Sequence, residues 1–122
     1  MHDTILVVDD ERLIRHAIVA DLSDAGFYVR EAASGAEALK ILVAGATVDA
    51  LLTDIRMPGA VDGWDLAEQA RTGRRDLPVI YVTAFSAERN RQVERSVLLK
   101  KPMTIEMILG ALAHLGLPRC AC

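Results

Sequence analysis

Three aspartates lie directly after apolar runs of strand length. Asp9 and Asp10 follow the run 5–8, and Asp54 follows the run 50–53. Parallel strands deliver their carboxyl ends to one edge of a sheet, where α/β proteins bind their ligands. Three like charges gathered there repel one another unless a cation joins them. The pattern therefore predicts a site for a hard divalent ion such as Mg²⁺, which carboxylates, waters and a phosphate oxygen can complete.

The acidic pair has a simpler interpretation when it is taken alone. Carboxylates are favoured in the first turn of a helix because they interact well with the helix dipole, and a helical pattern begins soon after Asp10. Asp54, at the end of a separate strand-like run, favours the metal site instead. A Lys101-Pro102 pair follows another apolar run, 97–99, and would bring a cation to the same edge.

The elements that must position these residues alternate along the chain. Apolar runs of strand length are separated by segments with helical periodicity, and the run 5–8 is uninterrupted, as expected for a strand buried on both faces. The expected strands are 5–8, 27–31, 50–53, 79–82 and 97–99, and the expected helices are 13–25, 34–45, 62–70 and 104–115. Such alternation predicts an α/β fold, a doubly wound parallel sheet with helices on both faces.

Residues with helix-end preferences support these limits. Gly26 is placed to end the first helix, and Ser34 with Glu37 has the spacing of a capping box. Asp62 and Thr104 are expected to cap the third and the last helix.

Composition places the chain among ordinary globular proteins. It has 122 residues, enough for one domain, with 52% apolar residues and a net charge of −3, which gives no support for nucleic acid as a partner. Arginines gather at 71–75 and 89–95, and we interpret them as solvated surface rather than a basic face.

No stretch is a secretory signal or is long enough to span a membrane. We expect a cytoplasmic protein whose only cysteines, Cys120 and Cys122, stay reduced in a flexible tail, 118–122, although a Cys-x-Cys pair could contribute to a soft-metal site.

Five segments in order resemble the receiver domain of two-component response regulators. They are LVVDDE at 6–11, LLTDIRMPG at 51–59, DGWDL at 62–66, PVIYVTA at 78–84 and LLKKP at 98–102. The resemblance covers residues 4 to about 116, so residues 1–117 are predicted to form one receiver domain. It implies a flavodoxin-like, five-stranded parallel sheet with strand order 2-1-3-4-5.

The resemblance also implies roles for individual residues. Asp54 would accept a phosphoryl group from a phosphohistidine. Asp10 would bind Mg²⁺ together with Asp54, Asp9 would act through a bound water, and the backbone carbonyl of Arg56 would add a ligand. Thr83 would hydrogen-bond a phosphoryl oxygen.

The resemblance also decides between two adjacent lysines. The cation at the site is expected to be Lys101 rather than Lys100, because the family lysine directly precedes a proline, often through a cis bond.

Three departures from the family pattern have structural consequences. One extra residue at Ala60-Val61 lengthens a loop, which should leave Asp54 in place. Leu98 stands where the family usually has an aromatic residue, so the usual paired movement of threonine and aromatic ring is not expected to carry over. Only thirteen residues, 84–96, join the fourth strand to the fifth, so the fourth helix of the family is expected to be short or irregular. Tyr81 to Phe85 resembles the strand ending of a subset of short bacterial receivers.

Three functions from different classes fit these residues. The first is a phosphoacceptor receiver that switches a protein-binding face and catalyses only its own phosphorylation and slow self-dephosphorylation, at a rate tuned by Arg56 and Phe85. The second is a pseudo-receiver, an interaction module that does not accept phosphate. The third is a Mg²⁺-dependent phosphohydrolase, which commonly needs an acid two residues after its nucleophile, where this chain has Arg56.

The first of these functions implies particular partners. A receiver would take its phosphoryl group from a histidine kinase or a histidine phosphotransfer protein. Its downstream protein target would bind the face formed by the fourth strand, the fifth strand and the last helix. A dimer that forms on phosphorylation is a further implication, and direct DNA binding and membrane contact are not expected.

Overall fold

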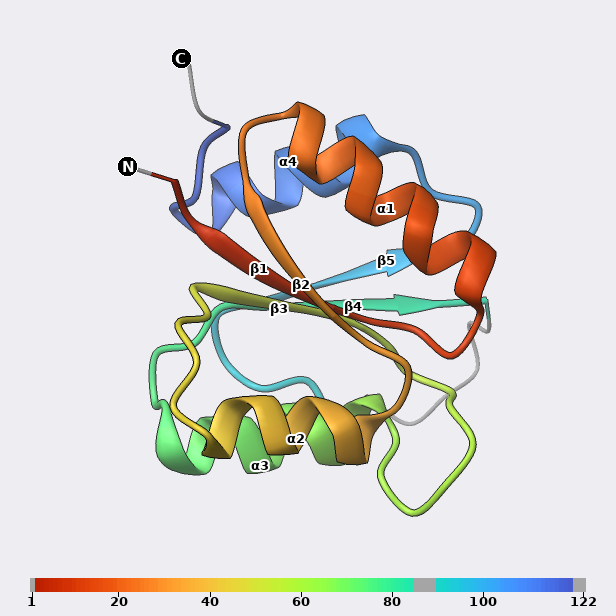
Figure 1. The fold of residues 1–122 in the computed structure, drawn as a ribbon, viewed down its shortest axis with the longest axis vertical. Helices are drawn as coiled ribbons and strands as arrows, with labels where there is room; N and C mark the ends of the chain where they lie inside the picture. Colours follow the sequence, from red (N-terminus) through yellow and green to blue (C-terminus); the bar gives the residue numbers. More distant parts are fainter. Residues whose placement is uncertain (1, 85–89, 120–122) are drawn as a thin grey trace.

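Five parallel strands form a single sheet in the order β2-β1-β3-β4-β5 (Figure 1). This computed structural model describes residues 2–84 and 90–119. The strands are β1 (Thr4–Val8), β2 (Tyr28–Ala32), β3 (Ala50–Asp54), β4 (Val79–Thr83) and β5 (Ser96–Lys100). The predicted α/β class and strand order are confirmed, with limits that differ from the predicted ones by a residue at several strand ends.

Helices cover both faces of the sheet. In Figure 1, α1 and α4 lie above the sheet, and α2 and α3 lie below it. The helices are α1 (Arg12–Asp24), α2 (Gly35–Val43), α3 (Gly63–Gly73) and α4 (Ile105–His114). Among the described residues, no helix is both long and apolar enough to cross a bilayer.

The sheet divides the apolar core into two clusters. Successive residues of a strand point to opposite faces, so Leu6 and Val8 pack toward α2 and α3, whereas Ile5 and Val7 pack toward α1 and α4. The four residues are almost fully buried. Burial on both faces explains why the run 5–8 has no polar residue.

The helix ends are formed largely by the predicted residues. The side chain of Asp62 accepts a hydrogen bond from the Asp65 N–H at 2.9 Å, and the carboxylate of Asp65 accepts one from the Asp62 N–H at 3.2 Å. Gly26 follows α1 with a φ of 98°, a conformation that glycine adopts without strain. Thr104 caps α4 through the Met107 N–H.

The predicted capping box at the start of α2 is wrong in one of its two bonds. Ser34 does accept from the Glu37 N–H at 3.1 Å. The Glu37 carboxylate accepts instead from the Ala33 N–H at 3.4 Å, one residue before the cap. The helix still begins where the pattern predicted, because the Ser34 bond alone satisfies one of its unpaired donors.

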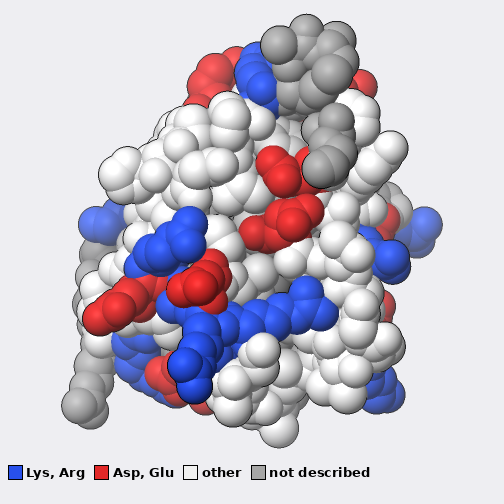
Figure 2. All heavy atoms as spheres, turned by 90° about the vertical axis from the view of Figure 1, so that its left-hand side faces the viewer, with Lys and Arg blue, Asp and Glu red and all other residues white. Residues whose placement is uncertain are grey.

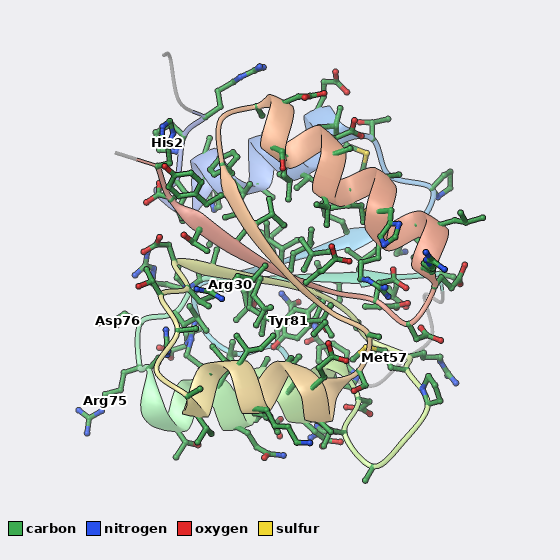
Figure 3. The ribbon with its side chains drawn as sticks, viewed as in Figure 1. His2, Arg30, Met57, Arg75, Asp76 and Tyr81 are labelled. Carbon is green, nitrogen blue, oxygen red and sulfur yellow. The ribbon has the colours of Figure 1, made fainter. Side chains whose placement is uncertain are left out.

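The described part of the connection between β4 and β5 contains no helix. Residues 90–95 follow an irregular path along α3, which rules out a regular three-turn helix over 86–95, while residues 85–89 lie outside the described part. The Arg91 guanidinium binds the carboxylates of Asp65 and Glu68 on α3, at 3.0 and 2.6 Å. The Val93 N–H donates to the hydroxyl of Tyr81, at 3.1 Å. Tyr81 lies between the sheet and the α2/α3 layer (Figure 3). The segment is therefore held by side chains rather than by helical hydrogen bonds.

Other arginines also bind protein groups. Arg74 donates to the carbonyls of Leu42 and Ala46 at the end of α2, and Arg95 donates to the carbonyls of Asp76 and Leu115. On the face near the amino-terminal ends of the strands, basic and acidic side chains are interleaved (Figure 2). Arg74 and Arg91 are only partly exposed and bind protein groups, so they are not the simply solvated side chains that were predicted, and Arg89 lies outside the described residues.

Candidate functional site

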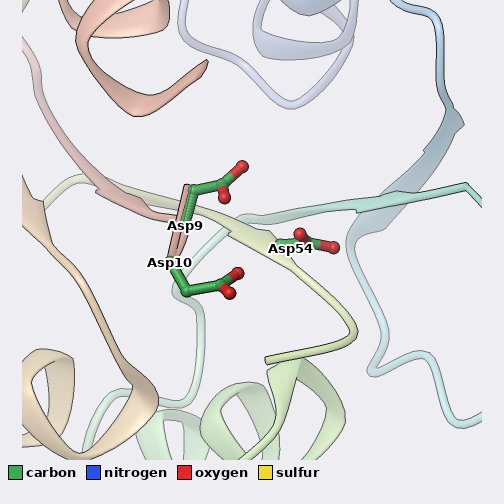
Figure 4. A group of neighbouring side chains, drawn as sticks. All are labelled: Asp9, Asp10 and Asp54. Atoms are coloured by element: carbon green, nitrogen blue, oxygen red, sulfur yellow. The ribbon is translucent and has the colours of Figure 1, made fainter. Parts of the chain in front are cut away.

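Asp9, Asp10 and Asp54 come together at the carboxyl edge of the sheet (Figure 4). Strand β1 pairs with β3, so the residues that follow β1 lie beside the last residue of β3. One carboxylate oxygen from each aspartate lies within 4.8 Å of the others. The chain also reverses its strand order here, since β2 lies on one side of β1 and β3 on the other, and α/β folds bind ligands at such a point.

Two of the three carboxylates are buried. Asp9 is 3% exposed and Asp54 is 8% exposed, whereas Asp10 is exposed. Burial raises the pKa of Asp9, although a hydrogen bond from the Glu11 N–H, at 2.9 Å, opposes this shift. Burial also raises the pKa of Asp54, against the charge of Lys101. These carboxylates are costly to ionise without a cation, and oxygen ligands of this kind suit Mg²⁺.

Lys101 provides a cation to Asp54. Its Nζ donates to Asp54 Oδ2 at 3.3 Å, and its backbone N–H donates to the Thr83 carbonyl at 2.8 Å. Burial lowers the pKa of the Lys101 ammonium, but the charge of Asp54 and its hydrogen bond outweigh that effect and leave the pKa raised. The adjacent Lys100 is exposed, and the Lys101–Pro102 peptide bond is cis.

Thr83 and Arg56 also lie near Asp54. Thr83 is the last residue of β4 and is 2% exposed. Strand β4 pairs with β3, so the end of β4 is adjacent to Asp54. The Arg56 backbone N–H hydrogen-bonds the Asp54 carboxylate and lowers its pKa. Every residue predicted for the site therefore lies at this one edge of the sheet. Phe85, which was predicted to tune the rate of self-dephosphorylation, lies outside the described residues.

Gly63 packs against the backbone of Asp54 and Ile55, a contact that the sequence did not predict. A Cβ at this position would lie 2.3 Å from the carbonyl oxygen of Asp54 and 2.7 Å from the Cα of Ile55. Its N–H donates to the Ile55 carbonyl at 2.8 Å. The start of α3 therefore packs directly on the backbone that carries Asp54, which only glycine permits. The spacing between Asp54 and the cap at Asp62 gave no hint of this contact.

Arg15 also contacts the site, and the sequence analysis assigned it no role. From α1, its Nη1 donates to the carbonyl of Asp9 at 2.9 Å, and its Nε donates to the carboxylate of Glu31 on β2 at 2.8 Å. The only signal in the sequence was the position of Arg15, one turn into the helix that follows the acidic pair. Helical periodicity cannot show which backbone carbonyl an arginine side chain reaches.

The lengthened loop before α3 leaves the aspartates together, as predicted. Val61 packs on Gly35 at the start of α2, where a Cβ would lie 2.5 Å from the Val61 carbonyl oxygen.

Leu98 is partly buried, and its Cα pairs with that of Tyr81 across β4 and β5. The aromatic ring in this part of the core thus comes from β4, and an aliphatic side chain occupies the β5 position.

An apolar hollow borders the site. It has a volume of about 450 Å³ and is lined by Ile14, Lys101, Pro102 and Met103. Leu13, on the same turn of α1 as Ile14, is 84% exposed. An apolar surface therefore lies beside Lys101 at this edge of the sheet.

The chain belongs to the response regulator receiver domain family. The family model for this domain matches residues 5–113, nearly the whole described chain. Among curated relatives, the response regulator MprA of Mycobacterium ulcerans is 35% identical over 115 residues, which cover 91% of this chain and 49% of that protein. The chain thus spans about half the length of the curated relatives it matches.

Solved structures agree with the family assignment. A response regulator receiver protein from Sinorhizobium medicae is 35% identical, with a TM-score of 0.88 over 93% of this chain and 94% of that one. The response regulator TrrA from Thermotoga maritima, solved in complex with Mg²⁺ and BeF, is 31% identical, with a TM-score of 0.80 over 93% and 98% of the two chains. The fold is therefore that of a receiver domain.

Proposed function

We propose that the chain is a phosphoacceptor receiver, in which Asp54 takes a phosphoryl group from a phosphohistidine with the help of Mg²⁺. The observation that carries this proposal is the position of Asp54, whose carboxylate lies within 4.8 Å of those of Asp9 and Asp10 and accepts from Lys101 at 3.3 Å. A carboxylate placed between acidic groups and a cation can act as a nucleophile toward phosphorus.

The three carboxylates fit a divalent ion. Asp10 and Asp54 would bind it directly, Asp9 would act through a water molecule, and the Arg56 carbonyl would complete the protein ligands. Two of the three acids are buried and of like charge, so a cation among them relieves both the repulsion and the cost of burial. When bound, Mg²⁺ would neutralise the charge of the phosphoryl oxygens. That TrrA binds Mg²⁺ supports this assignment.

Three residues of the chain would have separate roles in the phosphoryl transfer. An Asp54 carboxylate oxygen attacks phosphorus and forms a P–O bond, while the P–N bond to the donor histidine breaks and the imidazole leaves with its electron pair. Lys101 stabilises the charge on the phosphoryl oxygens, and the Thr83 hydroxyl donates a hydrogen bond to one of them. The step depends on position and charge, as phosphoryl transfers generally do.

The chain is not proposed to be an enzyme that acts on other molecules. It would catalyse only its own phosphorylation and a slow hydrolysis of the aspartyl phosphate. A phosphohydrolase would need an acid two residues after Asp54, and that position holds Arg56, whose guanidinium cannot act as a base at neutral pH.

The proposed function implies its partners. A histidine kinase or a histidine phosphotransfer protein would supply the phosphoryl group, and a downstream protein would bind the face formed by β4, β5 and α4. A dimer that forms on phosphorylation also belongs to this proposal, as does a location in the cytoplasm. Neither DNA nor a membrane is a proposed partner.

The intact mass after incubation with acetyl phosphate and Mg²⁺ tests the proposal. We expect one added phosphoryl group, and no addition in Asp54→Asn or when Mg²⁺ is chelated. Asn keeps the shape of the side chain but lacks the nucleophilic carboxylate. The absence of an adduct in the unaltered protein would favour the pseudo-receiver, a module that binds partners without accepting phosphate.

A further inference from the structure

Arg15 joins three elements at the base of the acidic site. It lies on α1, its Nη1 donates to the carbonyl of Asp9 after β1, and its Nε donates to Glu31 on β2. The Arg15 side chain is only 13% exposed. A guanidinium is planar and presents its donors as a rigid fork, so two bonds made by the same group fix its orientation.

The bond to the Asp9 carbonyl fixes a particular peptide plane. That carbonyl belongs to the peptide bond between Asp9 and Asp10, and its orientation therefore sets the direction in which the Asp10 side chain leaves the backbone. The other backbone group of Asp9, its N–H, donates to the Ala32 carbonyl at 3.2 Å. Both backbone groups of Asp9 are thus hydrogen-bonded, and the bond from Arg15 is the one nearer to Asp10.

Asp10 depends on this bond more than the other two acids do. Asp54 ends a strand within the sheet, and the carboxylate of Asp9 accepts a bond from the Glu11 N–H. Asp10 is exposed, and it follows the end of β1. The orientation of the preceding peptide plane would therefore help to decide where its carboxylate lies relative to a bound metal ion.

The charge of Arg15 acts in the opposite direction from its hydrogen bonds. A cation bound to the Asp9 backbone repels a divalent ion at the acidic cluster, so loss of the charge alone would strengthen metal binding. Loss of the hydrogen bonds would release the Asp9–Asp10 peptide and weaken metal binding. The two effects therefore have opposite signs, and a measured affinity distinguishes them.

We propose that Arg15 is a positioning residue for the metal site, which orients the Asp9–Asp10 peptide through its bond to the Asp9 carbonyl and is itself oriented by Glu31. This inference rests on the proposed Mg²⁺ site. Residues that orient metal ligands from outside the coordination shell typically contribute about 10- to 100-fold to metal affinity. We expect the lower end of that range, about tenfold, because Asp54 is held independently.

The test is a Mn²⁺ titration of the full chain, in which electron paramagnetic resonance measures the free ion. Arg15→Met keeps the packing of the long stem and removes both charge and donors. Arg15→Lys keeps the charge but has no planar fork to join the Asp9 carbonyl to Glu31. Arg12→Met is the control, because Arg12 is an exposed cation on the preceding turn of the same helix. Thermal melts without metal show that each variant is folded.

We expect Arg15→Met and Arg15→Lys both to bind Mn²⁺ about tenfold more weakly than the unaltered chain. Arg12→Met should bind equally well or slightly more tightly. Unchanged affinity in Arg15→Lys, or tighter binding in Arg15→Met, would overturn the positioning role. If Arg15→Met does not fold, the lysine variant decides alone. Failure of the unaltered chain to bind Mn²⁺ would instead count against the proposed metal site itself.

Discussion

Replacing Gly63 with alanine tests the close packing of α3 on the backbone that carries Asp54. The added Cβ would lie 2.3 Å from the Asp54 carbonyl oxygen, 2.7 Å from the Ile55 Cα and 3.0 Å from the Asp54 carbonyl carbon. All three are backbone atoms, so no side-chain rotation can relieve the overlap. Either the first turn of α3 or the end of β3 must move by about 1 Å to restore ordinary contact distances.

The cost of such overpacking is about 1–3 kcal/mol. Alanine has a better helix propensity than glycine by up to about 1 kcal/mol, but that advantage is small at the first helical position. We therefore expect the free energy of unfolding to fall by about 2 kcal/mol. At a slope near 1.5 kcal/mol per molar urea, the unfolding midpoint should fall by about 1.3 M. The displaced backbone should also weaken Mg²⁺ binding, because Asp54 moves with it.

Gly110→Ala is the matched control. Gly110 lies inside α4, its φ is not positive, and no atom lies within 4 Å of the position of its added Cβ. The same substitution there should raise the free energy of unfolding by about 0.5–1 kcal/mol. Urea denaturation followed by far-ultraviolet circular dichroism measures both variants. A midpoint for Gly63→Ala equal to or above that of the unaltered chain would contradict the packing argument.

Three further predictions concern the site and the segment beside it. Lys101→Ala should slow labelling of Asp54 by acetyl phosphate about 100-fold, because a charge that stabilises the phosphoryl oxygens is lost. Lys100→Ala should label normally, and equal loss in both variants, measured by intact mass, would refute the assignment. In the metal-free protein, burial raises the pKa of the two buried aspartates. The stability that their protonation contributes is present at low pH and is lost as the pH rises through those pKa values. Mg²⁺ needs the deprotonated carboxylates, so the rise in melting temperature that it causes should shrink as the pH is lowered through those pKa values. A rise that stays the same over the whole of that titration would argue against binding at this cluster. Arg91→Ala should leave the melting temperature nearly unchanged but speed the hydrogen exchange of the Val93 amide, which nuclear magnetic resonance measures. Unchanged exchange would show that the ion pairs of Arg91 do not hold residues 90–95 in place.

The alternation of strands and helices and the edge that carries the acidic residues could be predicted from local signals, whereas the strand order and the choice of Lys101 came from the family resemblance. An uninterrupted apolar run such as 5–8 indicates a buried parallel strand, and Asp62 and Thr104 mark helix starts through bonds to residues three positions away. The carboxyl-edge rule then places acidic residues after β1 and β3 on one edge. None of these inferences needed a contact between distant side chains.

The features that could not be predicted depend on such contacts. Gly63 is required by the backbone of Asp54, and Arg15 reaches a carbonyl on another element. The Glu37 carboxylate binds one residue away from its expected partner, because the turn before α2 orients the Ala33 N–H toward it. Residues 90–95 have no periodic pattern and are placed by Arg91 and Tyr81, whose partners lie many positions away in the sequence.

The division of the core by the sheet has a consequence for spectroscopy. Trp64 is the only tryptophan, and it lies in the α2/α3 layer, 4.8 Å from the ring of Tyr81 between centroids. Its emission therefore reports on one side of the sheet and is insensitive to rearrangements confined to α1 and α4. A tryptophan introduced at the exposed Met107 on α4 would provide the missing optical reporter for the opposite layer. Comparing the two emission signals would show whether an event at Asp54 reaches one side of the sheet or both.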